Sequence, residues 1–266
     1  AAQRTAVTTI VASARGESRT RPGHLLLSPS VKPNPPPLGS SISSSNTTME
    51  REFNEALAGK ATVHGARIKL ERAVYSELAA LEDEAQREAE KLATAEVDVI
   101  VYGCTSGSFI KGSKQYLGIE RRIEESFGIP CVATSGAVVR ALERLGAKNI
   151  TMITPYTHDI TEIEKQYLRA HDVNVLNYFH ASLTENLRIG RVSDEEVARW
   201  AVENLHPSAE AVFISCTNLS TFKAIRMVEE RTNRPTISSN SSTLWNVVKR
   251  LGLDADLSHL GRVFTL

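Results

Sequence analysis

VDVIVYGCTS, at residues 97–106, is matched by AEAVFISCTN, at residues 209–218. In each segment a short apolar run leads to a small residue, a cysteine, a threonine and a small polar residue. An apolar run of this length is typical of a strand buried on both faces, as in parallel sheets. The pattern therefore predicts two similar α/β halves, each with a cysteine just beyond the carboxyl end of a strand.

The repeat continues downstream of both cysteines. Ile129-Pro130 followed by ALERLG at 141–146 is echoed by Arg234-Pro235 followed by VVKRLG at 247–252. The two copies are offset by 112 residues at the cysteines but by 105 at the prolines. We expect the extra residues of the first copy in the loop that contains Lys111 to Lys114.

Between and around the two copies, helical and strand patterns alternate, which predicts parallel sheets flanked by helices. The expected fold is α/β, with two pseudo-symmetric flavodoxin-like halves and the active site in the cleft between them. Helices are expected at 50–59, 70–95, 118–127, 136–145, 159–171 and 193–204. Strands are expected at 97–102, 130–133, 150–154, 173–178 and 211–215.

The chain divides into a leader and two halves. Residues 1–40 hold six of the ten prolines and four arginines against one acid, which predicts disorder. Such a leader also fits a mitochondrial transit peptide or a misread gene boundary. We expect the first half at 41–147, with residues 24–28 as an alternative first strand. The second half is expected at 148–255, and residues 256–266 are expected to return to the first half.

Composition excludes several classes of protein. Lysine plus arginine and aspartate plus glutamate balance at 31 each, so neither nucleic acid nor an anionic membrane is an expected partner. No run approaches the roughly 18 apolar residues of a membrane span, so we expect a soluble protein. Whether it forms a homo-oligomer is left open by the sequence. Three cysteines without zinc spacing predict free thiols, no metal and a cytoplasmic location. No phosphate-binding glycine motif indicates a cofactor.

The two repeated cysteines are candidates for catalysis. Backbone N–H groups after such a strand can bind a carboxylate and lower the pKa of a thiol. One thiolate could then attack or abstract a proton while the other thiol donates one. A single strand-end cysteine is more often a packing residue, but Cys104 and Cys216 occupy equivalent positions of a repeat. Cys131 is interpreted as packing, because its repeat counterpart is Thr236.

Several short motifs resemble the aspartate/glutamate racemase superfamily, in the branch of maleate cis-trans isomerases and arylmalonate decarboxylases. They are SSNTTME at 44–50, YGCTS at 102–106, TPY at 154–156, ENL at 185–187 and SCTN at 215–218. One departure concerns the first of them. The branch has a strand running directly into this motif, whereas here a proline-rich segment separates residues 24–28 from Ser44.

The resemblance implies a role for each matching residue. Cys104 and Cys216 are the expected catalytic pair, of which the decarboxylases keep only the second. The expected substrate-binding residues are Asn46, Thr105, Ser106, Tyr156, Asn186, Thr217 and Asn218. Simpler explanations stay open for three of these: Asn46 as a helix cap, Tyr156 as a packing residue and Asn186 as a turn residue.

The leading hypothesis is a cofactor-independent cis-trans isomerase acting on a small carboxylate or dicarboxylate, similar to maleate isomerase. An amino-acid or hydantoin racemase, or a decarboxylase, of the same superfamily is the enzymatic alternative. A small-acid binding protein is the alternative outside catalysis, and it would need no lowered thiol pKa.

Overall fold

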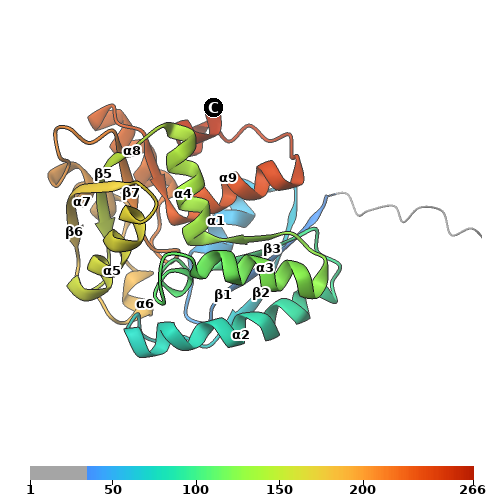
Figure 1. Cartoon of the computed structure of the whole chain (residues 1–266). Helices are drawn as coiled ribbons and strands as arrows, with labels where there is room; N and C mark the ends of the chain where they lie inside the picture. The colour runs from blue at the N-terminus through green and yellow to red at the C-terminus, as the bar shows by residue number, and fades with distance from the viewer. Residues whose placement is uncertain (1–34) are drawn as a thin grey trace, which may run out of the picture. The chain divides into compact units, whose positions relative to one another are not determined.

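The computed structural model describes residues 35–266. Two parallel four-stranded sheets lie in this part of the chain, in the orders β2-β1-β3-β4 and β6-β5-β7-β8 (Figure 1). The two orders are the same when the strands of each sheet are numbered along the chain. The two-half α/β fold expected from the repeat is therefore confirmed.

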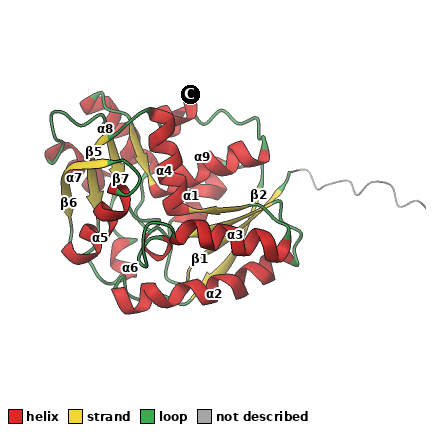
Figure 2. Ribbon diagram, in the orientation of Figure 1, coloured by secondary structure: helices red, strands yellow, loops and turns green. Residues whose placement is uncertain are grey.

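Helices alternate with the strands along most of the chain (Figure 2). The first sheet is built with β1 (Pro37–Ser43), α1 (Met49–Ala56), β2 (Thr62–Ile68), α2 (Tyr75–Ala93), β3 (Val99–Gly103), α3 (Gln115–Phe127), β4 (Cys131–Ala133) and α4 (Thr134–Leu145). The second is built with β5 (Asn149–Thr154), α5 (His158–Arg169), β6 (Asn174–His180), α6 (Asn186–Ile189), α7 (Asp194–Glu203), β7 (Ala211–Ile214), α8 (Phe222–Thr232), β8 (Thr236–Ser238) and α9 (Ser239–Leu251). Short 3₁₀ turns are η1 (Ser106–Ser108), η2 (Ser258–Leu260) and η3 (Arg262–Thr265).

The first strand corrects the expected boundary of the leader. β1 begins at Pro37, inside the segment expected to be disordered, and pairs in parallel with both β2 and β3. It tolerates proline at its first residue, where a strand can lose one N–H donor. The strand runs directly into Ser44-Ser45-Asn46, as in the branch that the sequence resembles. The alternative strand at 24–28 and the leader up to residue 34 lie outside the described residues.

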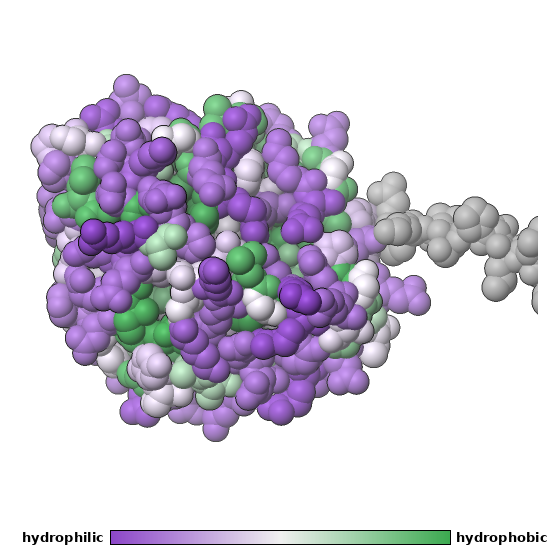
Figure 3. All heavy atoms as spheres, in the orientation of Figure 1, coloured by the Kyte–Doolittle hydropathy of each residue, from purple (hydrophilic) through white to green (hydrophobic). Residues whose placement is uncertain are grey.

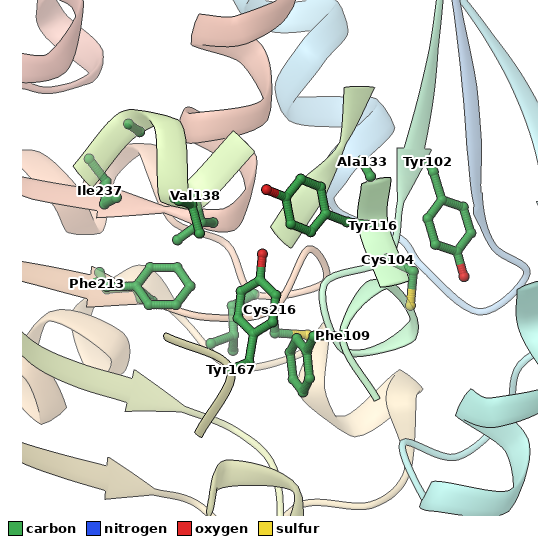
Figure 4. Close-up of a cluster of buried hydrophobic side chains, with 14 of the residues drawn as sticks. Tyr102, Cys104, Phe109, Tyr116, Ala133, Val138, Tyr167, Phe213, Cys216 and Ile237 are labelled. Carbon is green, nitrogen blue, oxygen red and sulfur yellow. The ribbon is translucent and has the colours of Figure 1, made fainter. Parts of the chain in front are cut away.

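Helix α9 corrects the expected division into halves. Leu244 and Val247 of α9 pack in one core cluster with Leu38 of β1 and Val99 of β3, so α9 covers the first sheet. Conversely, Val138 of α4 lies beside side chains of the second sheet (Figure 4). The sequence predicted a helix at 136–145 and matched its end with residues 247–252, but it did not predict which sheet each helix covers, and the boundary at 147 is too simple. Leu257 and Leu260 of the C-terminal segment belong to the α9 cluster.

A longer loop explains most of the difference between the two offsets of the repeat. Residues 105–114 separate Cys104 from α3, whereas residues 217–221 separate Cys216 from α8. The first copy uses its additional residues for η1 and the following turn, as expected.

On the face shown in Figure 3 the surface is mostly hydrophilic, with separate hydrophobic patches. Within residues 35–266, no helix is both long and apolar enough to cross a membrane.

Candidate active site

The carboxyl ends of strands from both sheets meet at one place. Thr217 donates a hydrogen bond to the Gly103 carbonyl (3.2 Å) and accepts one from the Asn46 amide (3.1 Å). The Thr105 hydroxyl donates to the Ser239 hydroxyl (2.9 Å), which accepts from the backbone N–H of Cys216 (3.0 Å). These bonds join the segments after β1, β3, β7 and β8, so both cysteines belong to one site between the halves.

Cys104 follows β3 directly and is 5% exposed. Its thiol is hydrogen-bonded to the backbone N–H of Gly107 and to the hydroxyls of Ser43 and Ser106. The N–H comes from the turn that contains η1, as expected for an anion-binding turn after a strand. These three donors would stabilise a thiolate.

Cys216 lies in a more constrained turn. Its φ is +100°, in a region that non-glycine residues rarely adopt, so its backbone conformation must be held by its neighbours. The Asn218 N–H donates to Cys216 Sγ (3.4 Å). The Tyr156 hydroxyl is hydrogen-bonded to the same thiol. The strained turn thus directs the sulfur toward donors from the segments that follow β7 and β5.

Burial changes the pKa of both thiols in a direction opposite to our expectation. It raises the pKa of the Cys104 thiol, and it raises that of Cys216 to about 12. A charged thiolate loses its hydration on burial, and the donors beside it recover only part of that free energy. In this closed conformation both cysteines are therefore neutral thiols near pH 7, and the expected lowering of their pKa is wrong.

The pKa of Tyr156 responds to negative charge on both thiols. Burial first, then negative charge on Cys216, Glu164 or Cys104, would hold its pKa well above the ordinary range. Its side chain is 2% exposed, which also agrees with a packing role. The hydrogen bond to Cys216 favours a polar role at the site.

Three asparagines link the halves. Asn46 accepts from the N–H groups of Thr48 and Met49 (2.9 and 3.0 Å) through its side-chain oxygen, so it holds the turn that leads into α1 although Thr48 is the N-cap, while its amide donates to Thr217. The Asn186 amide donates to Ser45 Oγ (2.9 Å). Both amide groups are thus at the site but take part in bonds within the protein.

Asn218 makes the largest number of these links. Its side-chain oxygen accepts from Thr47 N (2.8 Å), and its amide donates to the carbonyls of Asn186 (2.7 Å) and Ser45 (3.4 Å). Both amide protons are used, so we assign the side chain to positioning the other two asparagines. Only its backbone N–H faces Cys216.

The site is closed in this conformation. Exposure is between 1% and 5% for all nine predicted site residues: Asn46, Cys104, Thr105, Ser106, Tyr156, Asn186, Cys216, Thr217 and Asn218. Figure 4 shows both cysteines among buried aromatic rings, of which Phe109 and Tyr167 stack at 5.5 Å. The outer side of this pair lines a surface cavity of about 410 Å³. Both thiols thus have little contact with solvent in this conformation.

Sequence comparison decides the family. The pattern of the arylmalonate decarboxylase family matches residues 57–264, which is more than half of the chain. The chain belongs to this family. The branch that the motifs resemble is thereby confirmed.

Curated relatives of this arylmalonate decarboxylase family member include several isomerases. The maleate isomerase of Geobacillus stearothermophilus is 27% identical over 243 residues, covering 86% of this chain and 96% of that protein. The maleate isomerase of Alcaligenes faecalis is 25% identical over 242 residues, with the same coverage. The arylmalonate decarboxylase of Bordetella bronchiseptica is 27% identical over 150 residues, covering 56% and 62%.

Solved structures share the fold of this family member. The maleate isomerase Iso of Pseudomonas putida S16 superposes with a TM-score of 0.83 at 25% identity, covering 86% of this chain and 98% of that one. The Nocardia farcinica maleate cis-trans isomerase, in a cysteine-to-serine mutant with a covalently bound succinylcysteine intermediate, has a TM-score of 0.81 at 20% identity, with the same coverage.

Sequence reasoning missed three residues at the site of this family member. Ser43 and Gly107 contact the Cys104 thiol, and Ser239 bridges Thr105 and Cys216. The repeat did carry a signal for Ser239, because the match of Thr236 to Cys131 places it at the end of the last strand. Ser43 ends the proline-rich segment before Ser44, in which no strand was expected.

Cys131 lies away from this chemistry, as predicted. It is fully buried in β4, and burial raises its pKa well above the ordinary range. We expect Cys131→Ala to leave turnover within about 2-fold and to cost roughly 1 kcal/mol of stability, since only a sulfur is removed. Loss of turnover with an unchanged melting temperature would show a role in catalysis.

A buried carboxyl on α1 predicts a pH-dependent stability. Glu52 accepts from the N–H groups of Thr221 (2.6 Å) and Phe222 (3.2 Å) and from the Asn240 amide (2.6 Å). Burial raises its pKa from 4.5 to about 7. The protonated form is thus favoured by folding, so its stabilisation is complete below pH 4.5 and is lost as the pH rises through 7.

Urea unfolding at pH 5 and pH 8 measures this effect. We expect Glu52 to contribute about 3 kcal/mol to the decrease in unfolding free energy between these pH values. Glu52→Gln should show a correspondingly smaller decrease, because the amide does not ionise. Equal decreases in wild type and variant would mean that Glu52 is ionised throughout.

Proposed function

We propose that this protein is a cofactor-independent cis-trans isomerase that acts on a small dicarboxylate such as maleate. The observation that carries the proposal is the pair of thiols in one site, each with its own hydrogen-bond donors, in a chain related over most of its length to maleate isomerases. Neutral thiols are compatible with the reaction, because one sulfur must gain and lose a proton in each turnover.

In the proposed mechanism Cys104 is the nucleophile. Its sulfur adds to one carbon of the double bond, and the electron pair moves to the neighbouring carbon, where the attached carboxylate stabilises it. That carbon takes the proton of the Cys216 thiol, and Cys216 takes up the proton that Cys104 loses, so the net change is the addition of S–H across the double bond. The C–C bond is then single and can rotate. Expulsion of the sulfur restores the double bond in the trans arrangement, and no atom is gained or lost.

Cys216 is the proposed proton donor and acceptor at the second carbon. Three donors face Cys104, whereas Cys216 has two and is also affected by negative charge on Cys104 and Glu164. Removing a proton therefore costs more free energy at Cys216 than at Cys104. Tyr156, hydrogen-bonded to Cys216, would keep that thiol oriented.

Neutral groups would hold the two carboxylates. We propose that the amides of Asn46 and Asn186 exchange their present bonds for the substrate, together with Thr105, Ser106 and Thr217 and the backbone amides around them. We propose no cofactor or metal. Three free thiols fit a reducing compartment, and we place the enzyme in the cytoplasm, or in mitochondria if the leader before residue 35 is a transit peptide.

A substrate screen by NMR in deuterated water tests the proposal. Maleate should convert to fumarate, and a metal chelator should not change the rate. Deuterium incorporation into aspartate, glutamate or hydantoins would instead indicate a racemase, and carbon dioxide loss from substituted malonates a decarboxylase. Tight binding of maleate without turnover would favour a sensor.

A further inference from the structure

A buried carboxyl group in the second half has no role in this mechanism. Glu164 of α5 is 1% exposed. Its Oε1 accepts a hydrogen bond from Ser215 Oγ at 2.6 Å, and its Oε2 has no partner among the described residues. Burial raises its pKa from 4.5 to about 8, so the group is mostly protonated near pH 7.

Glu164 contacts the turn that carries the proton donor. Ser215 directly precedes Cys216, the residue with φ of +100°. The backbone of this turn is fixed by Ser215 N donating to the Ile153 carbonyl (2.8 Å) and by Cys216 N donating to Ser239 Oγ (3.0 Å). The carboxyl of Glu164 is the group that fixes the Ser215 side chain.

Among the described residues, no carboxyl is hydrogen-bonded to a side chain directly before Cys104. Gly103 occupies the position equivalent to Ser215, directly before Cys104. A Cβ added at Gly103 would lie 2.7 Å from both Ile42 Cγ2 and Met49 Sδ, so this position contacts apolar side chains of β1 and α1. The carboxyl therefore distinguishes the environments of the two thiols.

Titratable and charged groups near Glu164 lie on two sides, at the ends of the neighbouring strands and on the outer side of α5. From the strand ends, Cys216 and Tyr156 face it, and negative charge on Glu164 raises the pKa of both. On the outer side of α5, Glu162 and Lys165 pair with each other and contact Tyr178 of β6. No cation in the described part of the chain compensates Glu164.

We propose that Glu164 is a positioning residue for Cys216, acting through Ser215. As a neutral acid it holds the strained turn. When it ionises, a negative charge appears beside the second thiol and the bound dicarboxylate, and turnover falls. The effect on turnover rests on the proposed isomerase function. The effect on the Cys216 thiol does not, because it requires no substrate.

Two variants separate the carboxyl's charge from its hydrogen bond. Glu164→Gln keeps an acceptor for Ser215 but cannot ionise, whereas Glu164→Leu removes both. On maleate, we expect the Gln variant to keep kcat within about 2-fold at pH 7 and to lose the fall in activity above pH 8. The Leu variant should lower kcat about 10-fold with KM within about 2-fold, since the turn but not the carboxylate site is released.

A second measurement uses no substrate. The rate of Cys216 alkylation by iodoacetamide is measured from pH 6 to 10 by peptide mass spectrometry, with Cys104→Ser and Cys131→Ala in the background. Removing the like charge should lower the apparent pKa of Cys216 and speed alkylation at pH 9 about 10-fold in the Gln variant.

Identical alkylation profiles with and without Glu164→Gln would overturn the effect of the Glu164 charge on Cys216, even if the melting temperatures differ. An unchanged kcat in Glu164→Leu would overturn the positioning role. A changed profile, together with a wild-type protein that does not act on maleate, would refute the proposed function and leave the effect of Glu164 on Cys216 established. An alkaline fall in turnover that persists in the Gln variant would overturn the role of Glu164 ionisation in turnover.

Discussion

Replacing Cys104 by serine is expected to lower isomerisation on the order of 10³-fold or more, because a hydroxyl near pH 7 is a far weaker nucleophile than a thiolate. The fold should be unaffected. Serine is slightly smaller than cysteine, and the donors around the sulfur, from Gly107, Ser43 and Ser106, also suit an oxygen. Initial rates on maleate, with circular dichroism of the same samples, measure both.

Cys131→Ala is the matched control for this prediction, because it removes the third buried thiol outside the site. Retained turnover in Cys104→Ser would exclude Cys104 as the nucleophile. The same rate loss in both variants would point to a general effect of removing thiols from the core.

Gly107→Ala is expected to lower kcat on the order of 10²-fold, although the change adds a single methyl group. A Cβ at this position would lie 2.9 Å from Cys104 Sγ, 2.7 Å from the Tyr102 hydroxyl and 3.0 Å from Leu81 Cδ1. Tyr102 is fully buried, so it cannot move away into solvent. The thiol or the turn must therefore shift.

Gly118→Ala is the control for this substitution. Gly118 lies inside α3 with no atom within 4 Å of an added Cβ. Alanine should there stabilise the protein by about 0.5–1 kcal/mol and leave kcat unchanged. Unchanged kcat in Gly107→Ala would show that the Cys104 thiol does not need its present position.

The repeat around the cysteines predicted most of the fold, because its apolar runs have the length of buried strands and alternate with longer helical patterns. β3, β4, β5, β6 and β7 all lie within two residues of their expected bounds. β2 was missed because it is an edge strand of its sheet, in which only Ala66 and Ile68 are buried. Its sequence therefore lacks a continuous apolar run.

β1 was misplaced for a different reason. Its residues, PLGSSIS, follow several prolines and contain three serines, a composition that resembles a linker. Pairing with strands on both sides and packing of Leu38 and Ile42 in the core determine its structure. Such long-range contacts leave no local pattern in the sequence.

The predicted site residues do lie together, but two of their properties could not be read from the sequence. Motifs indicate which residues meet, whereas the pKa of a thiol depends on how deeply the folded chain buries it. Likewise, only the hydrogen bonds show that the Asn218 side chain links segments of the protein. The strained φ of Cys216 also has no sequence signal, since glycine does not occupy the position.

Intact-protein and peptide mass spectrometry of Cys216→Ser incubated with maleate tests the central claim most directly. If Cys104 adds to the double bond and Cys216 handles the proton, the variant should accumulate an adduct. We predict a mass increase of one maleate, located on Cys104 and absent from the variant that also carries Cys104→Ser. An unmodified Cys104 in a variant that still isomerises maleate at the wild-type rate would contradict the two-cysteine mechanism.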